Sequence, residues 1–495
     1  MKVIPPDFPL VTSNNVSANV ARAVPATASE DTLEGLVAEF HDVFDEETIT
    51  PMTGDPLHIH VRRDDPNYKP LRVFTARKVP LHYAKEAGEL VDLMLKSGVI
   101  ERVPTDETSE WCSPAFFRSK ASGGVRMVTD FRVINQFIER PVHPFPSCKD
   151  IIRSIRPDSR YFLKFDAVQG YHQVPLDEES SKLTTFLTEY GRFRFKRAPM
   201  GLIPCSDFFC ERTDSAFAEV DNLLKIVDNG LLQAPSQRVL LQNFRLVLEC
   251  ARRHNLTLSR PKLEMGQSVV FAGHLISHDG VRPDPRRTDA IANFPAPTNV
   301  SELRSFLGLV NQLGVFLPDL AHATLHLRGL LRKNVAFLWL EEQRNAFSAL
   351  KKLLLSPLVV RPFDISAGET RLLTDASRLK GLGYALLQSS SEGLSLIQCG
   401  SRSLNGAESR YSTTELECLG IYYAIKECKF FLQGANFTVV TDHQPLVGVF
   451  RKHLAELENM RLLRFRERLT QFSFCLLYTS PSPRDKRQSR MPSSA

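Results

Sequence analysis

Apolar residues recur with helical spacing in two parts of the chain. The first set lies before Gly98 and comprises Ala87, Leu90, Val91, Met94 and Leu95. The second set comprises Leu303, Phe306, Leu307 and Val310, and a Pro-bounded entry precedes it. Spacing of this kind places each set on one face of an amphipathic helix, and glycine commonly ends such a helix. The sequence therefore predicts two helices that bury one face each.

Short apolar runs typical of strands end in acidic residues at several places. "YFLKFD" ends at Asp166, and "KIVDNGLLQ" carries Asp228 followed by Asn229. We expect Ile226 and Val227 to be buried in a strand that reaches Asp228. Near the end of the chain, "LLTD" and "VVTD" show the same pattern.

The composition is that of a globular protein large enough for three or four domains. Of 495 residues, 43% are hydrophobic and 24% charged, and the formal net charge is +6. The nine cysteines form no CxxC pair, which argues against a zinc site or a disulfide scaffold and for a reduced intracellular chain. The sequence has neither a run long enough to cross a membrane nor the layout of a signal peptide.

The acidic strand ends at Asp166 and Asp228 are the first candidates for chemistry. A single acid at such a place is more often a cap or a solvated turn residue. Two such strands about sixty residues apart can pair and bring both carboxylates to one edge of a sheet. Mg²⁺ prefers several anionic oxygens, and two such ions clamp the attacking and leaving oxygens of a phosphoryl transfer. The pattern thus indicates a candidate metal-dependent site.

Several stretches, in order, resemble the polymerase and RNase H portion of a gypsy-type LTR-retrotransposon Pol polyprotein. They are "WCSPAFFRSKASGGVRMVTDFRVIN", "FLKFDAVQGYHQVPL", "PMGL", "FAGHLISHDGV", "ELRSFLGL", "LLTDAS", "SRSLNGAESRYSTTELECL" and "TDHQPL". The resemblance runs from about residue 40 to residue 474. It implies an α+β multi-domain protein, a right-hand reverse transcriptase with fingers, palm and thumb, followed by an α/β RNase H-like domain.

The resemblance also implies domain boundaries. We expect a loose N-terminal segment and linker over residues 1–65, fingers and palm over 66–283, and thumb and connection helices over 284–365. The RNase H-like domain would cover 366–474. Residues 475–495 change abruptly to a polar, basic sequence that resembles a vector- or adapter-derived read-through, so we expect a non-homologous tail.

In the polymerase, the resemblance assigns metal-binding and catalytic roles to Asp166 and Asp228. Asn229 stands where the family has a second Asp, and Ile226 where it has Tyr. Asn keeps the shape but loses the charge, and one unit-charge pair at 4 Å is worth roughly 4 kcal/mol at an effective dielectric near 20. Partial loss in the transition state would slow the reaction on the order of 10²–10³-fold. A decayed copy, a tolerated variant and a sequencing error all explain Asn229.

Four further residues would bind the incoming nucleotide, if the resemblance holds. Arg126 and Lys120, on the hairpin around Gly123 and Gly124, would hold the triphosphate, since a planar Arg fork suits phosphate oxygens. Tyr171 would lie under the sugar and block a 2′-hydroxyl, and Met200 would line the pocket. Without the resemblance, the two cations are ordinary exposed residues, and Tyr171 and Met200 are ordinary core.

In the RNase H-like domain, the resemblance makes Asp375, Glu417 and Asp442 metal-binding and catalytic residues. Glu417 is preferred to Glu415 because the family's acid directly precedes a small apolar run, here "ECLGI". The family's fourth acid is missing, since the only Asp after Asp442 is Asp485 in the tail. We therefore expect the domain to lack its last strand-helix segment and to be unstable or poorly active.

The resulting hypothesis is an RNA- or DNA-templated DNA polymerase with an RNase H domain. It implies Mg²⁺ or Mn²⁺ as cofactor, template-primer and dNTPs as partners, no membrane, and homo- or hetero-dimers with another Pol product. The location would be intracellular, in the cytoplasm, with virus-like particles as in the family. One alternative is a catalytically dead remnant that only binds template-primer, and another is a cyclase-like palm, against which the second acidic set argues.

Overall fold

The computed structural model describes residues 32–46, 49–120, 123–318, 320–355, 359–390 and 393–479. Most of the predicted loose N-terminus, the tail from residue 480 on and Asp485 lie outside these ranges. The described chain forms two compact units. One comprises the residues up to Ser154 and Asp158–Val269, and the other comprises Ile155–Pro157 and the residues from Val270 on. The predicted domain boundaries, which subdivide the chain more finely, stay predictions.

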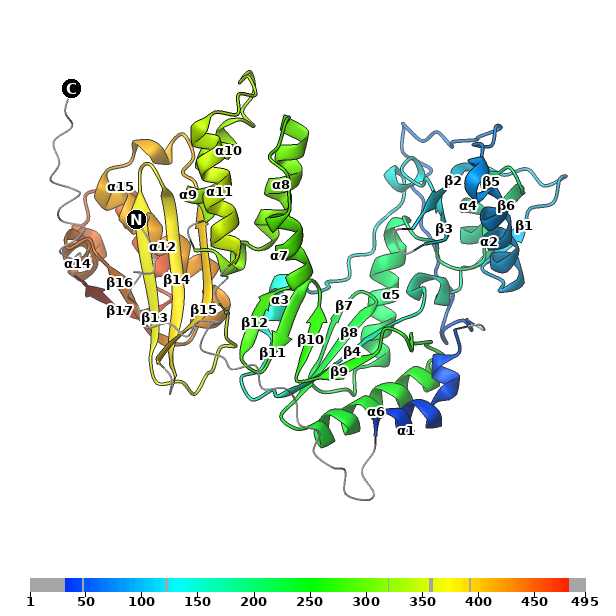
Figure 1. Ribbon diagram of the computed structural model, residues 1–495, viewed down its shortest axis with the longest axis horizontal. Coiled ribbons are helices and arrows are strands. Elements are labelled where there is room, and N and C mark those ends of the chain that lie inside the picture. The colour runs from blue at the N-terminus through cyan, green and yellow to red at the C-terminus, as the bar shows by residue number, and fades with distance from the viewer. Residues whose placement is uncertain are drawn as a thin grey trace. The chain divides into compact units, whose positions relative to one another are not determined.

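The first unit begins with a five-stranded sheet of order β1-β6-β5-β2-β3 (Figure 1). Its strands are β1 (Ile100–Arg102), β2 (Ser113–Ser119), β3 (Val125–Thr129), β5 (Phe186–Thr188) and β6 (Gly191–Phe195). Helix α2 (Ala84–Lys96) buries Ala87, Val91 and Met94, and Gly98 follows with a φ of 66°. The predicted helix and its glycine stop are therefore confirmed. Strands β2 and β3 pair antiparallel from Ala115↔Thr129 to Ser119↔Val125, and Gly123 and Gly124 before β3 have positive φ.

A four-stranded sheet of order β7-β8-β4-β9 forms the other part of this unit (Figure 1). Its strands are β4 (Tyr161–Asp166), β7 (Leu223–Ile226), β8 (Asn229–Ala234) and β9 (Glu264–Gly266). Helices α5 (Ile203–Ala216) and α6 (Gln237–Arg253) bury apolar faces in the same core. The shorter helical elements are α1 (Leu33–Glu39), η2 (His41–Phe44), η3 (Leu81–Tyr83), η4 (Ile134–Gln136), α3 (Cys148–Arg153), η5 (Gly170–Gln173) and α4 (Glu178–Leu183).

The second unit starts with a small sheet and a group of helices. The sheet comprises β10 (Ser268–Phe271), β11 (His274–Ser277) and β12 (Gly280–Pro283). The helices are α7 (Pro285–Ala292), α8 (Val300–Gln312), η6 (Gly314–Phe316), α9 (Leu320–Ala323), α10 (Leu325–Gly329) and α11 (Glu341–Leu355). Helix α8 buries Leu303, Phe306, Leu307 and Val310, which confirms the face predicted from the apolar spacing.

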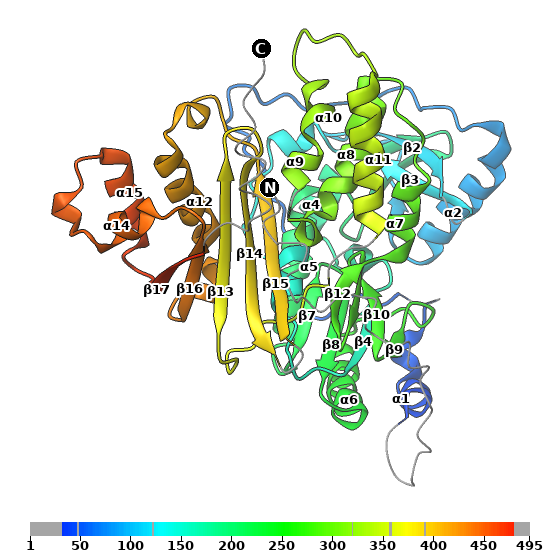
Figure 2. The same ribbon diagram turned by 60° about the vertical axis from the view of Figure 1, so that its left-hand side comes forward.

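The second unit also contains a five-stranded sheet of order β15-β14-β13-β16-β17, and α12 lies against one face of it (Figure 2). The strands are β13 (Thr370–Ser377), β14 (Gly381–Ser390), β15 (Gly393–Arg402), β16 (Asn436–Thr441) and β17 (Ser473–Tyr478). The helices are η7 (Glu408–Arg410), α12 (Thr413–Glu427), α13 (Lys429–Leu432), α14 (Pro445–Arg451), η8 (Leu454–Glu456) and α15 (Met460–Leu469). Strands β13, β16 and β17 run parallel, so their carboxyl ends share one edge.

Strand β17 corrects the expectation that this domain lacks its last strand. It pairs in register with β16 from Asn436↔Ser473 to Thr441↔Tyr478, and the backbone N–H of Thr479 donates to the carbonyl of Thr441 at 3.1 Å. Alternating Phe474 and Leu476 face the helices, which supplies the period-two pattern that a strand needs. Residues assigned from sequence to a foreign tail therefore complete an edge of the sheet.

Within the described ranges, none of the helices combines the length and the apolar character that a membrane-spanning helix requires.

Candidate active sites

The pairing of β4 with β8 determines the geometry of the first site. The two strands are antiparallel, with Asp166 opposite Asn229, and the backbone N–H of Ala167 donates to the carbonyl of Asp228 at 2.9 Å. Asp228 lies in the turn between β7 and β8. Asp166 and Asp228, which are distant in sequence, thus lie at the same end of the sheet, as the apolar strand pattern predicted.

The segment before Asp228 differs from the prediction of one continuous buried strand. Ile226 and Val227 are only half-buried, because β7 ends at Ile226 and the chain turns there. Val227 has a φ of 55°, a left-handed conformation that a β-branched residue rarely adopts. Conformations of this kind cost on the order of 1–3 kcal/mol and cluster at active sites, where the surrounding structure enforces them. The strained residue of this turn, Val227, therefore directly precedes Asp228.

Each carboxylate of this first site has a hydrogen-bond partner from the chain itself. Asp166 is buried, and Nζ of Lys262 lies 2.7 Å from its Oδ1. Burial raises the pKa of Asp166, the contact with Lys262 opposes that effect, and the negative charge of Asp228 raises the pKa further. Asn229 Nδ2 donates to Asp228 Oδ1 at 2.9 Å. An amide thus stands beside Asp228, where a second carboxylate would add negative charge.

Tyr171, one of the four residues expected to bind nucleotide, lies close enough to Asp228 for the charge of that residue to act on it. It belongs to η5, is half-buried, and packs edge-on against Phe209 with ring centroids 5.7 Å apart. Burial, with the charge of Asp228 next, raises the pKa of Tyr171 to about 12. Lys120 and Arg126 are exposed on the β2–β3 hairpin, and Met200 is 68% exposed in the loop before α5. Met200 is therefore not core.

Sequence reasoning missed two residues that shape this site. Lys262 was missed because its contact with Asp166 depends on the pairing of β9 with β4. Asn135 was missed although it ends the quoted "DFRVIN" stretch. Its Nδ2 donates to the carbonyl of Gly201 at 2.8 Å, and its Oδ1 accepts from the N–H of Ile203 at 3.1 Å. Asn135 thus fixes the loop that presents Met200.

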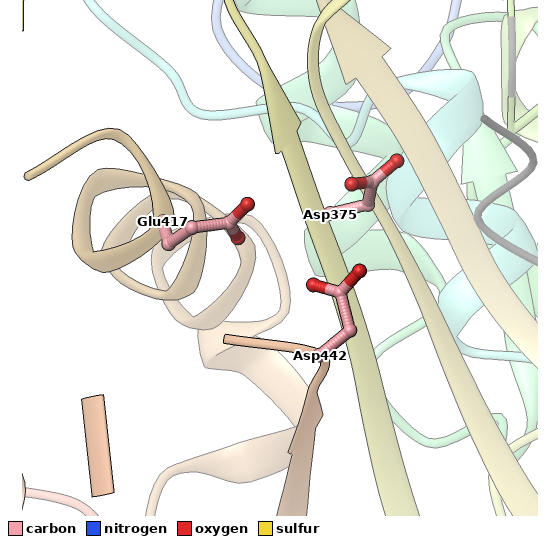
Figure 3. Close-up of side chains that lie close together, drawn as sticks. All are labelled: Asp375, Glu417 and Asp442. Carbon is pink, nitrogen blue, oxygen red and sulfur yellow. The ribbon is translucent and has the colours of Figure 1, made fainter. Parts of the chain in front are cut away.

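The second site forms where β13, β16 and α12 meet. Asp375 lies on β13, Asp442 directly follows β16, and Glu417 projects from α12 (Figure 3). One carboxylate oxygen from each of these residues lies within 4.8 Å of the others. Parallel pairing of β13 with β16 places both Asp residues at one edge. A Cβ at Gly420 would lie 3.4 Å from the Cβ of Ala376, so α12 packs closely on β13 there.

The two glutamates of α12 have opposite environments. Burial and the charges of Asp442 and Asp375 raise the pKa of Glu417 to about 9. Burial alone would also raise the pKa of Glu415, but hydrogen bonds from Asn459, Ser412 and Arg461 outweigh it and lower that pKa to about 2. Glu415 forms a capping box with Ser412 and stabilises the start of the helix. Glu417, not Glu415, therefore joins the acidic cluster.

This cluster fits a hard divalent cation. Glu417 Oε2 is buried and has no hydrogen-bond partner among the described residues, although such groups normally have one. Three converging carboxylates supply the anionic oxygens that Mg²⁺ or Mn²⁺ prefers, and an ion there would relieve their mutual repulsion. The first site offers two carboxylates and one amide, with the ammonium of Lys262 already at Asp166. It fits a cation less well.

Two parts of the chain match family models. Residues 118–276 match the model described as reverse transcriptase (RNA-dependent DNA polymerase). Residues 366–472 match the model of an RNase H-like domain found in reverse transcriptase. The first range contains Asp166 and Asp228, and the second contains Asp375, Glu417 and Asp442.

Similar curated proteins are transposon polyproteins. The chain is 29% identical over 459 residues to a retrovirus-related Pol polyprotein from transposon 412 of Drosophila melanogaster, covering 90% of this chain and 36% of that protein. It is 28% identical over 478 residues to the transposon Tf2-7 polyprotein of Schizosaccharomyces pombe, covering 94% and 35%. The chain thus spans about a third of the length of these relatives.

Solved structures share the fold. A foamy viral protease-reverse transcriptase in complex with dsDNA aligns with a TM-score of 0.78 at 18% identity, covering 90% of this chain and 93% of that one. The same viral protein in complex with an RNA/DNA hybrid aligns with a TM-score of 0.75 at 17% identity, covering 93% and 61%. The chain therefore has a multi-domain α+β fold in which a reverse transcriptase is followed by an RNase H-like domain, as in LTR-retrotransposon Pol polyproteins.

Proposed function

We propose that this chain is the polymerase and RNase H portion of a gypsy-type LTR-retrotransposon Pol polyprotein, with template-directed DNA synthesis impaired by Asn229. The observation that carries the proposal is the register of β4 and β8, which places Asp166 at the same end of the sheet as the Asp228 turn. Carboxylates converging in this way provide a site for phosphoryl transfer.

In this proposal, Asp166 and Asp228, with the amide oxygen of Asn229 as a weak neutral ligand, would hold Mg²⁺ or Mn²⁺. Such an ion, when bound, supplies charge stabilisation to the phosphoryl group and to the attacking primer 3′-oxygen. The amide nitrogen of Asn229 donates to Asp228 Oδ1, so this side chain is held beside the carboxylate that would bind the ion.

The nucleotide would be held by the residues around these acids. Arg126 and Lys120, exposed on their hairpin, have the charge to bind the triphosphate. Tyr171, which packs on Phe209 near Asp228, would exclude a 2′-hydroxyl. Met200, presented by a loop that Asn135 fixes, would contact the base or sugar. Loss of any one would affect nucleotide affinity more than metal affinity.

The RNase H-like domain would cleave RNA in hybrids through Asp375, Glu417 and Asp442, at a low rate. The described residues after Asp442 contain no further Asp, so the family's fourth acid is not supplied by them. Partners would be RNA/DNA template-primer and dNTPs, by analogy with the nucleic acids in the related viral complexes, and another Pol product in a dimer. The proposed location is a cytoplasmic virus-like particle.

Primer extension on RNA and DNA templates tests the proposal. We expect slow, metal-dependent extension by the wild type. The extension rate should rise about 10²–10³-fold in Asn229→Asp, and Asp166→Asn should not extend the primer at all. Equal rates for the wild type and Asn229→Asp would refute the role of this position.

The alternative of a dead remnant predicts a different outcome. Template-primer binding with a steep salt dependence but no extension, even by Asn229→Asp, would favour it. Two observations favour this alternative: Asn229 donates to Asp228 as a neutral amide, and the ammonium of Lys262 pairs with Asp166.

A further inference from the structure

Lys262 reaches Asp166 because of the register between β9 and β4. These strands are antiparallel, with Lys164 opposite Glu264. Asp166 ends β4 two residues after Lys164, and Lys262 lies in the turn two residues before Glu264, so this turn carries the Lys262 side chain to the aspartate. Nζ of Lys262 lies 2.7 Å from Asp166 Oδ1, a short charge-assisted hydrogen bond.

The two partners of this ion pair differ in their freedom. The Asp166 side chain is 8% exposed and anchored on a sheet strand, whereas the Lys262 side chain is 60% exposed, in the turn before β9. The lysine can leave without unfolding anything, and water can hydrate its ammonium when it does. The aspartate cannot move away. A metal ion can therefore bind Asp166 Oδ1 by displacing the ammonium of Lys262.

We propose that Lys262 is a built-in competitor of the divalent cation at the polymerase site, so that its ammonium must leave Asp166 before Mg²⁺ or Mn²⁺ binds. The proposal rests on the proposed function for the identity of the site. The ammonium of Lys262 and a divalent ion at Asp166 Oδ1 would repel each other at close range, so the free energy of the Lys262–Asp166 pair opposes metal binding. In the absence of metal, Lys262 therefore blocks Asp166 in the polymerase site, and a higher metal concentration is needed to displace it.

Mn²⁺ binding to the full chain, without nucleotide or primer, tests this inference. Free Mn²⁺ is measured by electron paramagnetic resonance, and every variant carries Asp375→Asn to weaken the second acidic cluster. We expect Lys262→Met to lower the dissociation constant at the polymerase site about tenfold, as removal of a competing charge-assisted hydrogen bond should. Lys262→Arg keeps the competing charge and should bind like the parent.

Lys164→Met is the matched control. Lys164 also lies on β4 and is a nearby positive charge, but its Nζ pairs with Glu264 at 2.7 Å instead of with Asp166. We expect this variant to change the dissociation constant less than about twofold, because only the long-range field is altered. Equal effects of Lys262→Met and Lys164→Met would overturn the inference, as would weaker binding by Lys262→Met.

Asp166→Asn shows which of the bound Mn²⁺ ions occupies the polymerase site, because this variant should abolish binding there. If it does not, the ion binds elsewhere and the inference fails. Lys262→Gln is a second neutral variant, expected to tighten binding in the same direction if Lys262→Met does not fold. Because the assay contains no nucleic acid, tighter binding without primer extension would support the inference while refuting the proposed function.

Discussion

Replacement of Glu417 by Gln should stabilise the metal-free protein, although it removes a proposed catalytic acid. Glu417 has an ordinary pKa of 4.5 and a folded-state pKa of about 9. Between those values the folded protein holds a proton that the unfolded chain releases. The contribution of Glu417 to the free energy of unfolding is therefore fully present below pH 4.5 and is lost as the pH rises toward 9.

The size of the effect follows from the same two values. At pH 7, which is about 2.5 pH units above the ordinary value, the buried group costs on the order of 3 kcal/mol. Glutamine has no charge to bury beside Asp375 and Asp442, so the variant avoids this cost. We expect Glu417→Gln to match the wild type near pH 5 and to exceed its free energy of unfolding by about 3 kcal/mol at pH 7.

Glu415→Gln is the matched control, two residues away on the same helix. The folded-state pKa of Glu415 is about 2, so its stabilisation is present above pH 4.5 and is lost as the pH falls toward 2. Its substitution weakens contacts with Ser412, Asn459 and Arg461 and should destabilise the protein by about 2 kcal/mol at pH 7. The two substitutions thus have opposite signs.

Urea unfolding in EDTA between pH 5 and pH 8, followed by circular dichroism, measures both variants. Coincident curves for Glu417→Gln and the wild type across this range would refute the electrostatic reasoning. Destabilisation by Glu417→Gln would do the same, since it would mean that the carboxyl group makes favourable contacts in the folded protein.

Further predictions concern metal, packing and the last strand. Mg²⁺ should stabilise the wild type increasingly from pH 6 to pH 8 and leave Glu417→Gln almost unchanged, which thermal unfolding with and without Mg²⁺ measures. Gly230→Ala should lower the melting temperature and abolish extension, because its Cβ would lie 2.3 Å from the Phe165 ring; a fully active variant would contradict this. Truncation after residue 472 should unfold the RNase H-like domain, whereas truncation after 479 should not, because β17 pairs along all of β16; equal protease resistance of the two would show that the strand is dispensable.

The sequence predicted the acidic edges well because each acid lies in or directly after the last residues of a locally apolar strand. Asp166, Asp375 and Asp442 needed only that local signal, and parallel or antiparallel pairing then brought the strand ends together. Glu417 needed the family motif, since helical spacing alone does not distinguish it from Glu415. The buried faces of α2 and α8 were likewise predicted by apolar residues that recur every 3.6 positions.

What the sequence did not reveal depends on tertiary context. The apolar run before Asp228 was predicted to be one strand because valine is rare in turns, yet Val227 lies in a turn and adopts a positive φ. Lys262 contacts Asp166 only through the register of β9, which no local pattern encodes. Strand β17 was missed because the composition after Phe474 suggested foreign sequence, while Leu476 still continued the alternation that pairs with β16.

Anomalous scattering from Mn²⁺ in crystals of the chain with template-primer and an unreactive dNTP analogue tests the central claim most directly. The account predicts manganese within about 2.2 Å of carboxylate oxygens of both Asp166 and Asp228, with the Lys262 ammonium displaced, and manganese among Asp375, Glu417 and Asp442. Well-ordered nucleic acid with no manganese at Asp166 and Asp228 would contradict it.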